Sequence, residues 1–120
     1  MSHTYNIRTE IRDRIALEAA CEKLGIKVLD GQTHHLYGGT EKGIGIKIPG
    51  WNYPVVVKDN GTLAYDDYNG SWGNKQDLTK LTAYYGLEKS KIEAEAEGYT
   101  VEESFNEKTQ ELELEITVEE

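Results

Sequence analysis

The chain has 120 residues, of which 22 are acidic and 13 basic, so its formal net charge at pH 7 is −9. This balance argues against nucleic acid as a partner, because phosphate binding needs clustered Lys and Arg. The apolar fraction of 38% is enough for one modest core, which predicts a single domain over residues 1–120. We find no apolar run of membrane-spanning length and no secretory leader, so we expect a small soluble, cytoplasmic protein that binds no membrane.

The first third of the chain predicts a strand, a helix and a second strand. Residues 5–11 alternate with a period of two, as a half-buried strand does. Asp13 is a suitable N-cap for a helix over about residues 14–24, and Gly25 stands where a helix end needs a left-handed residue. Residues 26–29 predict the next strand. The apolar stripe of the helix is expected to consist of Leu17, Ala20, Cys21 and Leu24.

Short strands are expected over residues 34–37 and 43–48, joined by a glycine-rich hairpin connection over residues 38–43. In the second of them the isoleucines face one way. Gly45 lies on the other face, where its small size leaves room for another backbone or a ligand.

The clearest hairpin in the sequence pairs residues 55–58 with residues 62–65. Between them stands Asn60-Gly61, the preferred pair for a tight type I′ turn, which needs positive φ at both central residues. The segment that follows, residues 66–74, is polar, aromatic and rich in glycine, so we expect a loop.

A long helix is predicted from about Asp77 to Glu97, capped by Asp77 or Asn74. Gly86 in its middle indicates a close contact or a bend. The predicted inward stripe of this helix is Leu78, Leu81, Tyr85, Ile92 and Ala96. Residues 100–105 and 110–118 then predict a second hairpin, whose last strand has one apolar face and one acidic face.

The order strand-helix-strands-helix-two strands predicts an α+β fold, a mostly antiparallel sheet with two helices packed on one face. Two hairpins would leave edge strands exposed. Homodimerisation by strand addition is therefore an alternative to a monomer.

The spacing of the potential nucleophiles, bases and metal ligands in the sequence predicts neither a catalytic site nor a metal site. An enzyme is therefore the least favoured functional class. His34 and His35 are adjacent on a strand and point to opposite faces, and no zinc-type spacing occurs, so we expect no metal and no cofactor. The single cysteine, Cys21, lies on the apolar side of its helix without a paired base, which predicts a buried structural thiol.

The most site-like segment is residues 65–74, because rigid aromatic side chains bury contact area at low entropic cost. With the aromatic residues of 51–53 it is expected to form one patch. Lys42, in the glycine-rich connection, is a further candidate for contact with a phosphate or nucleotide. The predicted ligand- or partner-binding residues are Tyr65, Asp67, Tyr68, Trp72, Trp51, Tyr53 and Lys42.

Four stretches also carry a resemblance that runs from end to end. They are the start Met1-Ser2-His3 with Ile7, Thr9, Ile11, Asp13 and the Leu24-Gly25 helix end, then residues 37–42, 78–85 and 97–102. In this order and spacing the chain resembles an uncharacterised family of small conserved proteins, a domain of unknown function from cyanobacteria, red-algal plastids, other bacteria and phages. The family's tryptophan-rich step near Tyr68 keeps only Trp72 here. The resemblance implies no catalytic residue, and gene neighbourhood implies a ring-forming ATPase as a protein partner.

Three functional hypotheses follow. The leading one is a non-enzymatic protein-interaction module that acts through the aromatic loop and an acidic surface. The first alternative is a small-ligand binding protein for a nucleotide or sugar. The second is an acidic inhibitor protein of phage type that occupies a basic groove, whose binding would weaken with salt. The ligand binder would use Tyr65, Tyr68, Trp72 and Lys42.

Overall fold

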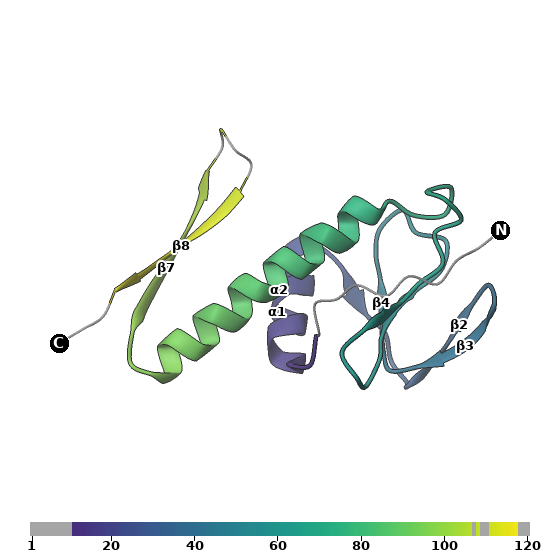
Figure 1. Cartoon of the computed structure of the whole chain (residues 1–120), viewed down its shortest axis with the longest axis horizontal. Helices are drawn as coiled ribbons and strands as arrows, with labels where there is room; N and C mark the ends of the chain where they lie inside the picture. The colour runs from purple at the N-terminus through teal and green to yellow at the C-terminus, as the bar shows by residue number, and fades with distance from the viewer. Residues whose placement is uncertain (1–10, 107, 109–110, 118–120) are drawn as a thin grey trace.

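A computed structural model describes residues 11–106, 108 and 111–117. Within them the fold is α+β, and every strand pairing is antiparallel (Figure 1). The strand predicted for residues 5–11 lies outside the described residues, apart from Ile11. In chain order the elements are α1 (Arg14–Leu24), β1 (Lys27–Val28), β2 (Thr33–Leu36), β3 (Gly39–Lys42), β4 (Ile44–Lys47), β5 (Val55–Val57), β6 (Leu63–Ala64), α2 (Lys75–Ala96), β7 (Thr100–Asn106) and β8 (Glu111–Thr117).

Helix α1 has the bounds and the caps that the sequence predicts. The Asp13 side chain accepts a hydrogen bond from the Ala16 N–H at 3.1 Å, which satisfies one of the free donors at the helix start. Gly25 ends the helix with φ of 70°. Of the predicted stripe, Leu17, Ala20 and Cys21 are buried and Leu24 is half-buried.

The strands divide into a four-stranded sheet with the order β1-β4-β5-β6 and two separate hairpins, β2–β3 and β7–β8. All three residues of β5 are buried, so both faces of the four-stranded sheet are covered. One face shares its core with the helices through Ile46, Val55 and Val57.

Hairpin β2–β3 covers the other face of this sheet at Gly45. A Cβ on Gly45 would lie 2.5 Å from His34 Cε1, so the imidazole packs directly on the glycine backbone. The room predicted at Gly45 is thus filled by a side chain, and neither by a second backbone nor by a ligand.

Two turns differ from their predictions. Residues 39–42 form strand β3 instead of a connection, because Leu36 pairs with Gly39 and the hairpin loop shortens to Tyr37 and Gly38. At the next hairpin, positive φ occurs at Gly61 but not at Asn60, so the turn is not of type I′. The Gly61 N–H donates to the Lys58 carbonyl at 2.8 Å instead, which gives a longer loop with a glycine bulge.

Helix α2 is capped by Asn74, whose side chain accepts from the Gln76 N–H at 2.9 Å. Its predicted stripe is confirmed at Leu78, Leu81 and Tyr85, but the last position is wrong: Ala96 is exposed and Ala94 is buried instead. Gly86 has no close neighbour, since a Cβ built there would meet nothing within 4 Å.

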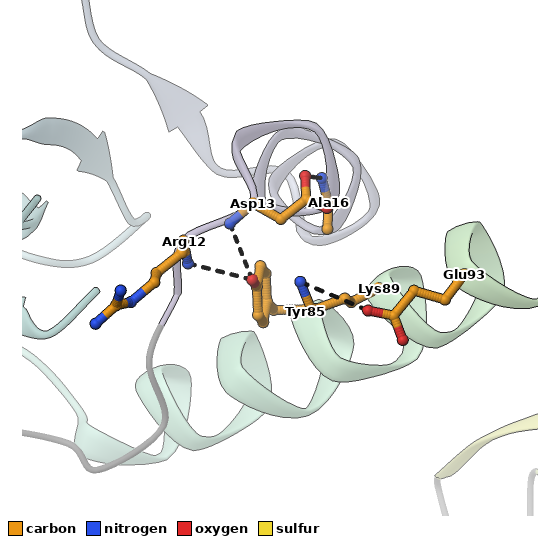
Figure 2. A network of polar contacts seen from close by, with 6 residues as sticks. All are labelled: Arg12, Asp13, Ala16, Tyr85, Lys89 and Glu93. Atoms are coloured by element: carbon orange, nitrogen blue, oxygen red, sulfur yellow. Dashed lines mark hydrogen bonds and ion pairs between the residues drawn. The ribbon is translucent and has the colours of Figure 1, made fainter. Parts of the chain in front are cut away.

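Tyr85 ties α2 to the start of α1. Its hydroxyl oxygen accepts hydrogen bonds from the backbone N–H groups of Arg12 at 3.2 Å and Asp13 at 3.0 Å (Figure 2). An ion pair between Lys23 and the buried Glu88 joins the same two helices further along. The helix pair is therefore fixed by specific polar contacts as well as by its apolar core.

We expect Tyr85→Phe to destabilise the fold by about 1–2 kcal/mol, because two partly buried N–H groups lose their acceptor. Urea denaturation measures the change. Tyr84→Phe is the matched control and should be near neutral, since the contact of the Tyr84 ring with Lys80 does not use its hydroxyl. Equal effects of the two substitutions would contradict this role of Tyr85.

Hairpin β7–β8 extends the molecule beyond the C-terminal end of α2 (Figure 1). The principal extents are 54 × 32 × 23 Å. Strands β7 and β8 contact each other most, and the element that each contacts next most is α2. An isolated two-stranded hairpin is marginal in water, so this hairpin depends on α2 for support. Neither helix of the described residues is long and apolar enough to cross a membrane.

Candidate functional site

Four aromatic rings from three separate segments meet at one place, which we call the aromatic cluster. It consists of Tyr37 in the β2–β3 turn, Tyr53 before β5, and Tyr68 and Trp72 in the loop before α2. Trp72 is its centre, since its ring centroid lies 4.6 Å from that of Tyr68, 5.0 Å from Tyr37 and 5.3 Å from Tyr53. The Tyr68 and Trp72 rings are stacked, at 22°.

The aromatic cluster faces solvent. Tyr37 is 61% exposed and Tyr68 is 41% exposed, while Tyr53 and Trp72 are half-buried. Among the described residues, the other large exposed apolar side chain is Ile15 on α1. Exposed aromatic groups gathered in one patch mark an interaction surface more often than scattered single residues do.

Backbone hydrogen bonds hold the loop that carries Tyr68 and Trp72. The Asp67 carbonyl accepts from the N–H groups of Gly70 at 3.0 Å and Trp72 at 2.8 Å, and the Trp72 carbonyl accepts from Asn52 at 2.9 Å. Tyr68 and Asn69 both have positive φ, 45° and 54°. Non-glycine residues adopt this conformation at a cost of order 1 kcal/mol each. The loop conformation in which Tyr68 stacks on Trp72 is therefore a strained one.

Trp51 and Tyr65 belong to the hydrophobic core and not to the exposed aromatic cluster. Each is only 4% exposed, and their ring centroids are 6.0 Å apart. The Trp51 indole N–H donates to Asp77 Oδ2 at 2.9 Å, which anchors the ring to the first turn of α2. Gly73 lies against the face of that ring, where a Cβ would be 2.5 Å from Cε2. These two predicted site residues are therefore buried core residues.

Two consecutive buried carboxylates stand at the start of the loop. Asp67 is 1% exposed, and neither of its oxygens has a hydrogen-bond donor among the described residues. Lys75 Nζ lies 3.9 Å from Asp67 Oδ2, an ion-pair distance that is too long for a hydrogen bond. Asp66 is 6% exposed, and its Oδ1 likewise has no donor in the described part of the chain.

Lys42 belongs to a different surface. It lines a groove of about 420 Å³ together with Arg14 and Asp59, and none of the aromatic residues lines that groove. The predicted grouping of Lys42 with Tyr65, Tyr68 and Trp72 is therefore not formed. Tyr37, in turn, is a site residue that the sequence reasoning missed. Recognising it requires the β2–β3 register, which puts Tyr37 at a hairpin tip.

The described residues contain no group of three or more His, Cys, Asp and Glu side chains arranged to hold a metal ion. Burial, and secondarily the Glu18 carboxylate, raise the pKa of the buried Cys21 thiol to about 11. This thiol stays protonated at neutral pH and is a structural group.

The aromatic cluster can bury apolar or cationic side chains of a partner against its ring faces while its phenol and indole groups donate hydrogen bonds at the edges. Three of its four residues are tyrosines and the fourth is a tryptophan. No protein-family model, no curated protein and no solved structure matches this chain.

Proposed function

We propose that this chain is a protein-interaction module that binds its partner through the aromatic cluster. The observation that carries the proposal is the convergence of Tyr37, Tyr53 and Tyr68 on Trp72 at an exposed surface. Tyrosine and tryptophan are enriched among the few residues that supply most of the binding energy of protein interfaces. The strain that the loop accepts at Tyr68 and Asn69 supports a role for this surface beyond packing.

A protein partner fits this surface better than a nucleotide or sugar does. Small-molecule sites are concave and bury most of the ligand. Here the rings pack on one another at centroid distances of 4.6–6.4 Å, so they fill the space between them and present an uneven face. The small-ligand alternative also needs Lys42 beside Trp72, and Lys42 lines another groove.

Charge favours a basic partner. The net charge of −9 attracts a positively charged protein at long range and accelerates encounter. A ring-forming ATPase is the partner to test first, and the acidic inhibitor remains a second class. The dependence of binding on salt concentration distinguishes the two classes. Binding that depends mainly on exposed charges is lost above physiological ionic strength, whereas binding through buried aromatic rings persists.

The test is affinity capture with Trp72→Ala. We expect this substitution to weaken capture of the partner by roughly 30-fold, the effect of losing a hot-spot residue worth about 2 kcal/mol. The matched control is Ile15→Ala, which removes the exposed apolar side chain on α1, outside the aromatic cluster, and should leave capture unchanged.

Each variant is also melted to confirm that the fold survives. Capture that is unchanged for Trp72→Ala in a folded protein would refute the role of the aromatic cluster. Capture that is lost for both variants alike would show that the loss is not specific to the aromatic cluster. A third outcome would favour the acidic inhibitor. In that case the wild type loses binding at high salt, and Trp72→Ala binds the partner as well as the wild type does at low salt.

A further inference from the structure

A cavity of about 130 Å³ adjoins the aromatic cluster at the Tyr37 turn. Its walls come from the two sides of that turn and from the end of β6, directly before the loop that carries Tyr68. The residues that line it are Leu36, Gly38, Gly39, Thr40, Glu41, Ala64, Tyr65 and Asp66. The cavity and the aromatic cluster thus share the β2–β3 turn, so one partner can contact both.

Asp66 gives this cavity a buried acid, and the cavity differs from the groove lined by Asp67, which also contains Lys75, in having no basic residue in its wall. Its side chain is more than nine-tenths buried, and its Oδ1 has no hydrogen-bond donor among the residues that the structure describes. A buried carboxylate oxygen without a donor is costly and is rarely left so without a reason. Glu41 adds a second, half-buried carboxyl group to the wall, and none of the lining residues is basic.

We propose that this cavity receives the guanidinium group of an arginine side chain of the protein partner. The inference rests on the proposed function and specifies the chemistry of the partner. The arginine supplies the donors that Asp66 lacks, while the flanking part of the partner lies on the aromatic cluster. Arginine, with tyrosine and tryptophan, is the residue type most enriched at interface hot spots.

Size and geometry favour a guanidinium over other cations. The cavity volume equals that of about four water molecules at roughly 30 Å³ each, and a guanidinium has four non-hydrogen atoms. Its planar fork of N–H donors pairs with carboxylates through charge-assisted hydrogen bonds and loses little water on burial. A calcium ion needs roughly six to eight oxygen ligands, whereas this cavity offers two carboxyl groups, from Glu41 and Asp66.

The first measurement is an NMR titration of the isotope-labelled full chain with N-acetyl-arginine methylamide. We expect the amide signals of Gly38, Gly39, Thr40 and Asp66 to shift and saturate. The citrulline analogue, which has the same shape and no charge, should shift them at least tenfold less at equal concentration.

Asp66→Asn should weaken the arginine response at least tenfold, and Asp59→Asn, a change at an exposed acid that lines the other groove, should leave it unchanged. Glu41→Gln, at a half-buried position, gives a second test should Asp66→Asn fail to fold. Equal shifts with citrulline, or an unaltered response in a folded Asp66→Asn protein or in Glu41→Gln, would overturn the proposal. So would shifts caused by calcium or magnesium chloride but not by the arginine probe.

This probe carries no aromatic-binding segment, so its result is independent of the Trp72→Ala capture test. Arginine binding with unaltered capture by Trp72→Ala would retain the cavity assignment and refute the aromatic interface. Capture that depends on Trp72, with no arginine response, would retain the interface and overturn the arginine site.

Discussion

Gly43→Ala is expected to abolish the stable fold. Gly43 has φ of 148°, a region that L side chains rarely adopt. A Cβ there would also collide with the Val57 carbonyl oxygen and lie 2.9 Å from its carbon. Because that obstacle is backbone, in a strand paired with β4 through Ile44, no side-chain rotation relieves it. Strain and overpacking each cost about 1–3 kcal/mol, so a loss of about 4 kcal/mol approaches the whole stability of a small domain.

Gly39→Ala is the matched control for this prediction. Gly39 has nearly the same φ, 146°, but a Cβ there would meet nothing within 4 Å. Its substitution adds the strain without the collision, so we expect a loss of about 1–3 kcal/mol and a folded protein. Urea denaturation and amide NMR spectra compare the two variants. Similar losses for both would show that backbone strain, and not the collision with β5, makes Gly43 necessary.

The parts of the fold that the sequence predicts well are those decided by neighbouring residues. The Asp13 cap, the left-handed Gly25 and the Leu17, Ala20, Cys21 stripe depend on groups within one or two helical turns. The same holds for the Asn74 cap, one of two alternatives considered. Capping and periodicity are local, so a single sequence contains them.

The parts of the fold that differ from the prediction depend on how neighbouring strands pair with each other. Residues 39–42 are glycine-rich and polar, and they become a strand because β2 pairs with them. The turn at Asn60 follows from the pairing of Lys58 with Thr62, which the preferred Asn-Gly dipeptide does not determine. In both places the pairing of the strands overrides the preference of the individual residues.

The candidate site divides in the same way. The sequence shows that residues 51–53 and 65–72 contain several aromatic side chains, and it does not distinguish a core ring from a surface ring. Trp51 and Tyr65 are buried and Tyr53, Tyr68 and Trp72 are not, because only the first pair packs between the sheet and the start of α2. The β2–β3 register places Tyr37 at the hairpin tip. There its ring contacts Trp72, which lies more than 30 residues later in the chain.

Gly73→Ala is expected to lower stability by about 3 kcal/mol and to weaken partner capture at the same time. The new methyl group would overlap the Trp51 ring, and the displaced indole would lose its hydrogen bond to Asp77. Overpacking contributes about 1–3 kcal/mol and the lost bond about 1 kcal/mol. Since Gly73 follows Trp72 directly, the shift also moves the centre of the aromatic cluster.

Gly86→Ala is the control, because it adds the same methyl group where nothing lies within 4 Å. That position is inside α2, so the substitution should raise stability by up to about 1 kcal/mol and leave capture unchanged. Trp51→Phe separates the two contributions at Gly73, since it removes the indole N–H and keeps an aromatic ring in the core. If Gly73→Ala destabilises the fold but captures the partner normally, the hydrogen bonds of the Trp72 backbone to Asp67 and Asn52 are sufficient to place the indole. If both properties fail together, the buried Trp51 determines where the exposed Trp72 stands, and the core and the interaction surface form one cooperative unit.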